Sequence, residues 1–107
     1  MAISAQRIYI VSTPASWRVV QERGELRTPA FETEGFIHAA TAEQVPDVLA
    51  RHFAGQEDLL LLEIDPLAIA DFLRYELSPA SGDTYPHIYA PVPVSAVLSV
   101  QPIAANR

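Results

Sequence analysis

The sequence contains no cysteine and no lysine among its 107 residues. Without cysteine, the chain can form no disulfide, and it has no thiolate to bind a metal ion or to act as a nucleophile. Without lysine, its cationic side chains are seven scattered arginines, and the formal net charge is −6. We therefore expect no nucleic-acid partner, because binding to a phosphate backbone requires clustered positive charge. Arginine is left as the main side chain for holding an anion.

Long hydrophobic runs are also missing. The apolar stretch LLLLEI at 59–64 is far shorter than the roughly 20 residues of a membrane-spanning helix, and the first residues lack the apolar segment of a signal peptide. We therefore expect no membrane partner and a cytoplasmic location, which fits the absence of cysteine. Hydrophobic residues make up 50% of the chain, enough for a folded core, and the length predicts a single domain over residues 1–107.

Alternating apolar and β-branched residues predict six strands, at 7–12, 35–39, 58–65, 72–77, 87–90 and 97–103. Two helices are predicted between them. The first covers 15–23, after the N-cap and proline pair Thr13-Pro14. The second is marked by the capping-box pattern at 41–44, is expected to start a few residues late because of Pro46, and ends at Gly55.

The remaining segments 25–34 and 78–86 are expected to be irregular, because turn-forming residues dominate the second of them. The strand at 58–65 is predicted to be buried on both faces, with Leu61 in the core. Strands and helices do not alternate regularly along the chain. We therefore predict an α+β fold with a mostly antiparallel β-sheet of about six strands and two main helices.

Polar and aromatic side chains recur at alternate positions in three of the expected strands. Residues two apart in a strand share a face. This places together Phe36 with His38, Arg74 with Glu76, and Tyr85 with His87 and Tyr89. If these faces look into one cleft, they supply two imidazoles, a carboxylate, a guanidinium and two phenols, which suits acid–base chemistry or the binding of a polar ligand.

From this pattern, the candidate catalytic residues are His38, Glu76 and His87. The candidate ligand-binding residues are Tyr9, Thr13, His38, Arg74, Tyr85, His87 and Tyr89. Structural roles are the alternatives: a histidine beside apolar residues is often satisfied within the fold, and Arg74 with Glu76 can form a solvated strand face. His52 is better explained by packing or as a cation favoured by the helix dipole, and Trp17 by packing in the core.

The segment GFIHAAT at 35–41 raises the question of why a histidine follows Phe36-Ile37. Alternation predicts that Ile37 and Ala39 face the core, and that His38 points outward on the side of Phe36, toward the strand of Tyr85 to Tyr89. Replacing His38 or His87 by alanine is then expected to cost little stability and to abolish ligand binding.

Five segments together resemble a bacterial family of domains of unknown function, family 952: IYIV at 8–11, GFIHAATAEQV at 35–45, AGQEDLLLLEID at 54–65, RYE at 74–76 and YPHIYAPVPVSAV at 85–97. The resemblance covers nearly the whole chain. It implies an ADP-ribosyltransferase-like fold, with a split β-sheet and a cleft between its halves. Members of that superfamily split NAD between nicotinamide and ribose.

The resemblance carries over only in part. Where family members usually have a histidine in the first strand, this chain has Ile10, which cannot donate a hydrogen bond. Where transferases carry a late glutamate, this chain has Tyr85 and His87, and Glu76 is the nearest acid. We therefore expect a small-molecule site, with NAD or a related nucleotide as a candidate ligand, without standard ADP-ribosyl transfer. No cofactor is certain.

Two other functions remain open. A non-catalytic protein-interaction module would use the acidic surface and exposed tyrosines. A metal site would use His38, Glu76 and His87, although no HxH or HxxxH spacing supports it. The sequence leaves open whether any reaction is catalysed.

Overall fold

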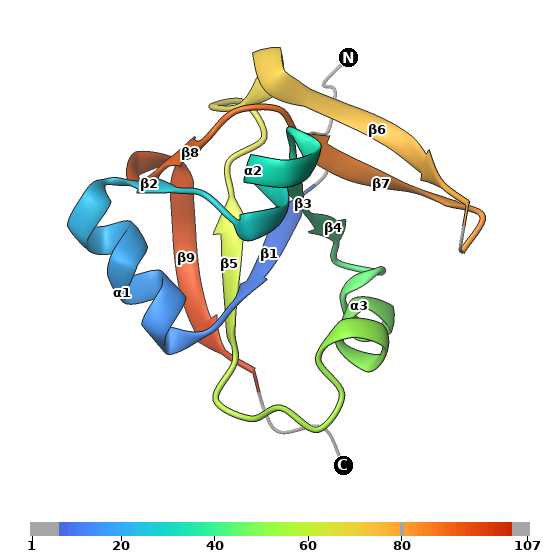
Figure 1. Ribbon diagram of the computed structural model, residues 1–107, viewed down its shortest axis with the longest axis horizontal. Coiled ribbons are helices and arrows are strands. Elements are labelled where there is room, and N and C mark those ends of the chain that lie inside the picture. Colours follow the sequence, from blue (N-terminus) through green and yellow to red (C-terminus); the bar gives the residue numbers. More distant parts are fainter. Residues whose placement is uncertain (1–6, 80, 104–107) are drawn as a thin grey trace.

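The computed structural model describes residues 7–79 and 81–103 (Figure 1). Its strands are β1 (Ile8–Ser12), β2 (Glu25–Leu26), β3 (Ile37–His38), β4 (Ala40–Thr41), β5 (Leu60–Ile64), β6 (Leu73–Ser78), β7 (Asp83–Ile88), β8 (Val92–Pro93) and β9 (Val97–Pro102). Its helices are α1 (Pro14–Arg23), α2 (Pro29–Glu34) and α3 (Val45–His52), with short 3₁₀ turns at Ala70–Phe72 and Val94–Ala96.

The strands form three antiparallel sheets, in the orders β4-β1-β5-β9, β2-β8 and β3-β7-β6. The α+β prediction with mostly antiparallel strands is therefore confirmed. The number of elements differs from the prediction: the described part of the chain has nine strands, several of two residues, and three helices, where six strands and two helices were expected. No helix in residues 7–79 and 81–103 has the length and hydrophobicity needed to span a membrane.

Helices α1 and α2 begin and end in the same way. Thr13 and Thr28 are N-caps, each followed by proline, and their hydroxyls accept the N–H of Ser16 and Phe31 at 3.1 Å. Both helices end at a glycine with a positive φ, 85° at Gly24 and 88° at Gly35. The first helix was predicted. The expectation that 25–34 is irregular is wrong, because the Thr-Pro signal recurs there.

Helix α3 starts late, as the proline near its start predicts. Its N-cap, Gln44, makes no side-chain cap hydrogen bond. Only half of the capping box forms: the Thr41 N–H donates to Gln44 Oε1 at 3.0 Å. Thr41 itself lies in β4, paired with Ile8 of β1, so sheet formation takes the place of helix capping here. The helix ends at His52, before Gly55.

The core lies on one face of the four-stranded sheet. Its residues from β1 and β5 are Ile8, Ile10, Leu62 and Ile64, packed against Val20, Leu26, Ile37, Ile88 and Val92 from the other elements. Leu62 is fully buried, whereas Leu61 is half-buried on the opposite face of β5. The expectation that β5 is buried on both faces with Leu61 in the core is therefore wrong.

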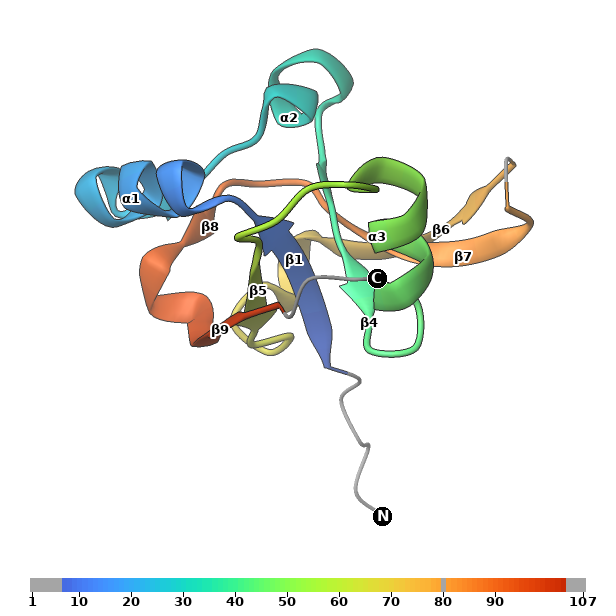
Figure 2. The ribbon, with the colours of Figure 1, turned by 90° about the horizontal axis from the view of Figure 1, so that it is seen from below.

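The β6–β7 hairpin extends away from this core, as Figure 2 shows from below. Its register pairs Ser78 with Asp83 and Leu73 with Ile88. The expectation of an irregular loop over the whole of 78–86 is wrong, since Ser78 belongs to β6 and residues 83–86 belong to β7. The connection is a short turn that includes Gly82, with a φ of 74°.

The strand expected at 35–39 is only the two-residue β3, and β4 follows it at once in another sheet. Ile37 and His38 pair with Ile88 and His87 of β7, whereas Ala40 and Thr41 pair with β1. Between them, the Ala39 N–H donates to the Pro86 carbonyl at 3.1 Å. This segment thus joins the three-stranded sheet to the four-stranded sheet.

Candidate functional site

The outer face of the three-stranded sheet carries the polar side chains. Arg74 of β6 and His38 of β3 both lie opposite His87 of β7. On the other face, Ile37 and Ile88 are fully buried. The alternation argument is therefore confirmed: Ile37 and Ala39 are buried, and His38 is exposed.

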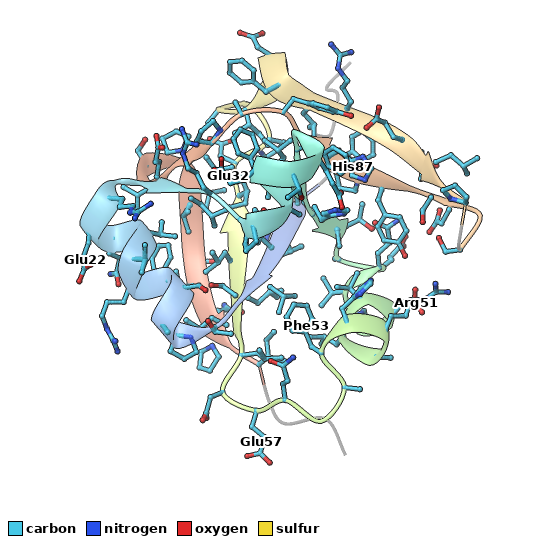
Figure 3. All side chains as sticks on the ribbon, in the orientation of Figure 1. Glu22, Glu32, Arg51, Phe53, Glu57 and His87 are labelled. Carbon is cyan, nitrogen blue, oxygen red and sulfur yellow. The ribbon has the colours of Figure 1, made fainter. Side chains whose placement is uncertain are left out.

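We call the group on this outer face the imidazole cluster; its members are Glu34, Phe36, His38, Arg74, Glu76, His87 and Tyr89. It joins α2 and β3 to the β6–β7 hairpin. Figure 3 shows His87 beside β7, close to α2. The cluster brings together the three residues that the sequence singled out as catalytic candidates, His38, Glu76 and His87.

His87 is held on two sides. Its Nδ1 lies 2.7 Å from Glu76 Oε1, and its ring stacks on Phe36 with 4.1 Å between centroids and 22° between planes. Its side chain is only 12% exposed. With Nδ1 bonded to the carboxylate and the ring fixed by stacking, Nε2 is the nitrogen left for a ligand. A carboxylate at Nδ1 also favours the tautomer and orientation used by catalytic histidines.

Glu76 is the polar centre of the cluster. Its Oε1 accepts a hydrogen bond from the Tyr89 hydroxyl at 2.6 Å as well as the contact with His87. The hydrogen bond from Tyr89 is the largest cause of a lowered pKa of Glu76, and the hydrogen bond with His87 is the next. The charges of His87 and Arg74 lower this pKa further. The bond between Tyr89 and Glu76 raises the pKa of Tyr89, because it favours the neutral phenol. The Arg74 guanidinium lies 5.9 Å from the centre of the Tyr89 ring.

His38 occupies the outer edge of the cluster. Its Nε2 lies 2.9 Å from Glu34 Oε1, and both side chains are at least half exposed, at 57% and 50%. Its ring is 4.8 Å from that of Phe36 and 5.4 Å from that of His87. The two imidazoles therefore lie side by side, each bound to a carboxylate through one nitrogen.

Two members of the cluster were missed as site residues. Phe36 was placed on the correct face but given no role, although its ring contacts His38, His87 and Tyr89. Glu34 was missed because its segment was expected to be irregular. The signal that could have found it is the Thr28-Pro29 pair, which predicts a helix ending near Gly35.

Three predicted ligand-binding residues lie apart from the cluster in their contacts. The Tyr85 hydroxyl donates to Asp47 of α3 at 3.3 Å. Tyr9 belongs to β1 of the four-stranded sheet, opposite Ala40 and Glu63. Thr13 uses its hydroxyl to cap α1.

A cleft was expected at the imidazole cluster, but the hollow that the structure shows lies elsewhere. A shallow hollow of about 330 Å³ lies at the far end of β1 and is lined by Pro14, Glu57, Asp58, Leu59, Leu60, Pro102 and Ile103. Figure 3 places Glu57 far from His87. We base the site on the imidazole cluster, because the hollow offers two carboxylates and otherwise apolar side chains. The cluster is a face of a sheet, open to solvent on the side of His38.

The cluster is not arranged as a metal site. Glu76 bonds to His87 instead of converging with it on a common point, and within residues 7–79 and 81–103 no group of three or more histidine, aspartate or glutamate side chains is placed to hold a metal ion. The metal hypothesis therefore gains no support from the geometry.

Comparison with known proteins gives the family. The X-ray structure of protein CC0527 from Caulobacter crescentus is similar, with a TM-score of 0.86 and 29% identity over 94% of this chain and 88% of that chain. The solution NMR structure of CC0527 gives 0.81 and 29%, over 94% and 86%. A search of curated proteins found no match. Among models of protein families, the one described as "Protein of unknown function (DUF952)" matches residues 11–100 of this chain. The chain therefore belongs to the DUF952 family.

Proposed function

We propose that the imidazole cluster binds a small polar molecule that carries an aromatic ring and an anionic group, with nucleotides of the NAD or ADP-ribose type as the leading class. The observation that carries the proposal is the pair of adjacent imidazoles, each fixed through one ring nitrogen by its own carboxylate. Such fixing leaves the second nitrogen of each ring in a set position for a ligand.

The cluster is difficult to explain as a device for stability. The pair of His38 with Glu34 is exposed at both ends, and exposed ion pairs contribute only about 0–1 kcal/mol. The buried face of the same sheet, with Ile37 and Ile88, already packs against the core. Fixing the exposed His38 ring beside the largely buried His87 ring adds little to folding but is the kind of orientation that a binding site requires.

Each part of the cluster suits one part of such a ligand. Arg74 can donate to an anionic group such as phosphate, and each imidazole can do so through its second nitrogen when the ring is protonated. Phe36 and Tyr89, 5.3 Å apart between ring centroids, offer aromatic surface for a planar ring. His87 with Glu76 also forms a pair of the kind used in general acid–base catalysis.

Standard ADP-ribosyl transfer is not part of the proposal. Ile10, which stands where the resemblance would place a ribose-binding histidine, is a core residue only 5% exposed. The ADP-ribosyltransferase-like superfamily therefore stays a prediction about ancestry and ligand class. The proposed function is binding, in a chain whose first strand lacks the usual hydrogen-bond donor.

Thermal unfolding in the presence of ligands tests the proposal. NAD, ADP-ribose, AMP, nicotinamide and inorganic phosphate would be added separately, since a ligand that binds the native state at 100 times its dissociation constant stabilises it by about 2.7 kcal/mol. The single compounds separate a ring-binding site from a phosphate site. Histidine ring NMR signals would be followed in the same titrations.

Three matched variants complete the experiment. We expect His38→Ala and His87→Ala to remain folded and to lose the ligand-induced shift in melting temperature. His52→Ala is the control, because His52 is exposed like His38 but lies in α3, outside the cluster. If no nucleotide shifts the melting temperature at millimolar concentration, or if His52→Ala abolishes the shift as fully as His87→Ala, the proposal is wrong.

A further inference from the structure

Strand β6 forms an open edge of the three-stranded sheet. The sheet order β3-β7-β6 gives β6 a single neighbouring strand, and Figure 1 shows it as the outermost strand of the hairpin. Large apolar side chains are exposed along it: Tyr75 is 43% and Leu77 is 65% exposed. An open, six-residue edge of this kind can pair with another strand.

The hydrogen-bonding groups that β6 presents outward can be identified. The Pro86 carbonyl accepts from Ala39 on the β3 side, so the backbone of Pro86 faces away from β6. Tyr75 lies opposite Pro86, and its own N–H and C=O therefore point away from β7. The same alternation turns the backbone groups of Leu77 and the carbonyl of Leu73 to the open edge, whereas the Leu73 N–H already donates to the Ala70 carbonyl of the preceding 3₁₀ turn.

The sequence of β6 is self-complementary about Tyr75. Residues 73–77 read Leu-Arg-Tyr-Glu-Leu. In an antiparallel pair of two such strands with Tyr75 opposite Tyr75, Arg74 lies opposite Glu76 and Leu73 opposite Leu77. Opposite charges and apolar side chains that face each other across two strands stabilise the pairing, whereas like charges destabilise it. Shifting the centre to Arg74 or Glu76 would put two like charges face to face.

We propose that a second copy of this chain pairs with β6, antiparallel and centred on Tyr75, to form one six-stranded sheet with two-fold symmetry. Tyr75 would form a hydrogen-bonded pair with Tyr75 of the second copy, because its backbone groups are those directed outward. Arg74 and Glu76 of the second copy would then form a non-hydrogen-bonded pair, in which side chains approach most closely. Charge, apolar pattern and backbone direction all select the same register.

The pairing brings the two imidazole clusters together. Arg74 and Glu76 lie on the cluster face, so each Glu76 would gain an arginine from the second copy. Glu76 uses Oε1 for both His87 and Tyr89, and Oε2 can accept the guanidinium. Arg74 of one copy is thus a positioning residue for the carboxylate of the other.

The other long edge of the fold is less suited to pairing. Strand β9 is the edge of the four-stranded sheet and exposes Leu98 and Val100, at 56% and 36%. Its register with β5 shifts between Glu63 and Ile64, and it ends at Pro102. Irregularities and prolines of this kind protect an edge from pairing.

Sedimentation of the full chain, without ligand, measures the association. One strand edge is a small interface beside the roughly 1,200–2,000 Å² of stable complexes, so the concentration would run from about 10 μM to about 1 mM. We expect a reversible monomer–dimer equilibrium. A sedimentation coefficient that stays monomeric up to the highest concentration would overturn the proposal, as would a trimer or larger closed assembly.

Substitutions test the register. Arg74→Glu places carboxylates opposite each other and should weaken the dimer at least roughly tenfold, and the double exchange Arg74→Glu with Glu76→Arg should restore it. Tyr75→Lys should also abolish pairing, whereas Leu98→Lys on β9 is the matched control and should leave the mass unchanged. Thermal melting would confirm that each variant is folded. Dimerisation that survives Tyr75→Lys, or that is lost in Leu98→Lys, refutes pairing through β6.

Hydrogen exchange gives a readout that needs no variant. In the dimer the amides of Tyr75 and Leu77 should become protected as concentration rises. The amides of Leu73, already bonded to Ala70, and of Arg74 and Glu76, already bonded to β7, should not change. Outward amides that exchange at the same rate in dilute and concentrated solution would contradict the proposal. Because no ligand is present, this result is independent of nucleotide binding.

Discussion

Comparing the N-caps of α1 and α2 tests whether the Thr28 cap of α2 holds His38 in its position. Thr28→Ala removes the bond from the Phe31 N–H that begins α2. Thr13→Ala removes the equivalent bond, of the same 3.1 Å length, that begins α1. Both substitutions delete the same chemical group in front of a proline. Only α2 leads directly into the imidazole cluster, because it ends with Glu34 and passes through Gly35 to Phe36.

The size of the effect follows from the caps and helix lengths. Loss of a threonine N-cap costs about 1 kcal/mol, within a range of roughly 0.5–2. For a chain of 107 residues, with about 2.1 cal/mol/K of unfolding entropy per residue, that is about 4 °C in melting temperature. The six-residue α2 has no fully buried residue and Phe31 as its half-buried anchor. In Thr28→Ala we therefore expect α2 to open locally about five times more often for each kcal/mol of stability that the helix loses.

Hydrogen exchange and histidine NMR signals measure the difference between the two variants. Thr28→Ala should accelerate exchange at the amides of 31–35 and shift the ring signals of His38, whereas Thr13→Ala should lower the melting temperature and leave both unchanged. Thr28→Ser keeps the cap and should behave as the parent chain. If Thr28→Ala leaves His38 unaffected, or if Thr13→Ala disturbs it equally, then α2 does not position the histidine.

Two further predictions concern the core and the centre of the cluster. Leu62→Ala should cost about 2–5 kcal/mol in chemical denaturation, and Leu61→Ala clearly less because that side chain is half-buried; an equal loss would place both faces of β5 in the core. The pKa of Glu76 is lower in the folded chain than its ordinary value of 4.5. Its contribution to stability is therefore complete above pH 4.5 and is lost as the pH falls through the folded-state pKa. Glu76→Gln should flatten the pH dependence of the melting temperature in that acid range. The bond to Glu76 raises the pKa of the Tyr89 phenol, so Glu76→Gln should lower that pKa toward its ordinary value. An ultraviolet titration with Tyr89→Phe as reference measures it, and an unchanged phenol titration would contradict the Tyr89–Glu76 bond.

The predictions that held depended on local rules with a clear physical signal. Thr13-Pro14 and Gly24 marked the ends of α1, because cap and left-handed residues act within one helical turn. Alternation placed His38 outside and Ile37 inside, because a strand has a side-chain period of two. The convergence of His38, Glu76 and His87 also followed from alternation, applied to three strands at once.

The predictions that failed required knowledge of neighbouring strands. The residues Asp83 to Pro86 have turn-forming chemistry, but pairing with β6 makes them a strand. Pro86 is tolerated in a middle strand because its backbone faces the end of β3 instead of the ladder with β6. Leu61 and Leu62 have the same side chain, and only the packing of β1 and the other elements decides which is buried.

The segment 37–41 sets a limit on how the chain can change in length. Ile37 and His38 are registered against β7, and Ala40 and Thr41 against β1, with Ala39 as the one residue between the two sheets. Inserting or deleting one residue here would turn every side chain on one side of the change to the opposite face. His38 would enter the core, or Thr41 would leave its place opposite Ile8. Among related chains, insertions should therefore collect in the turn between β6 and β7, where added residues alter no register, and be absent from these five positions.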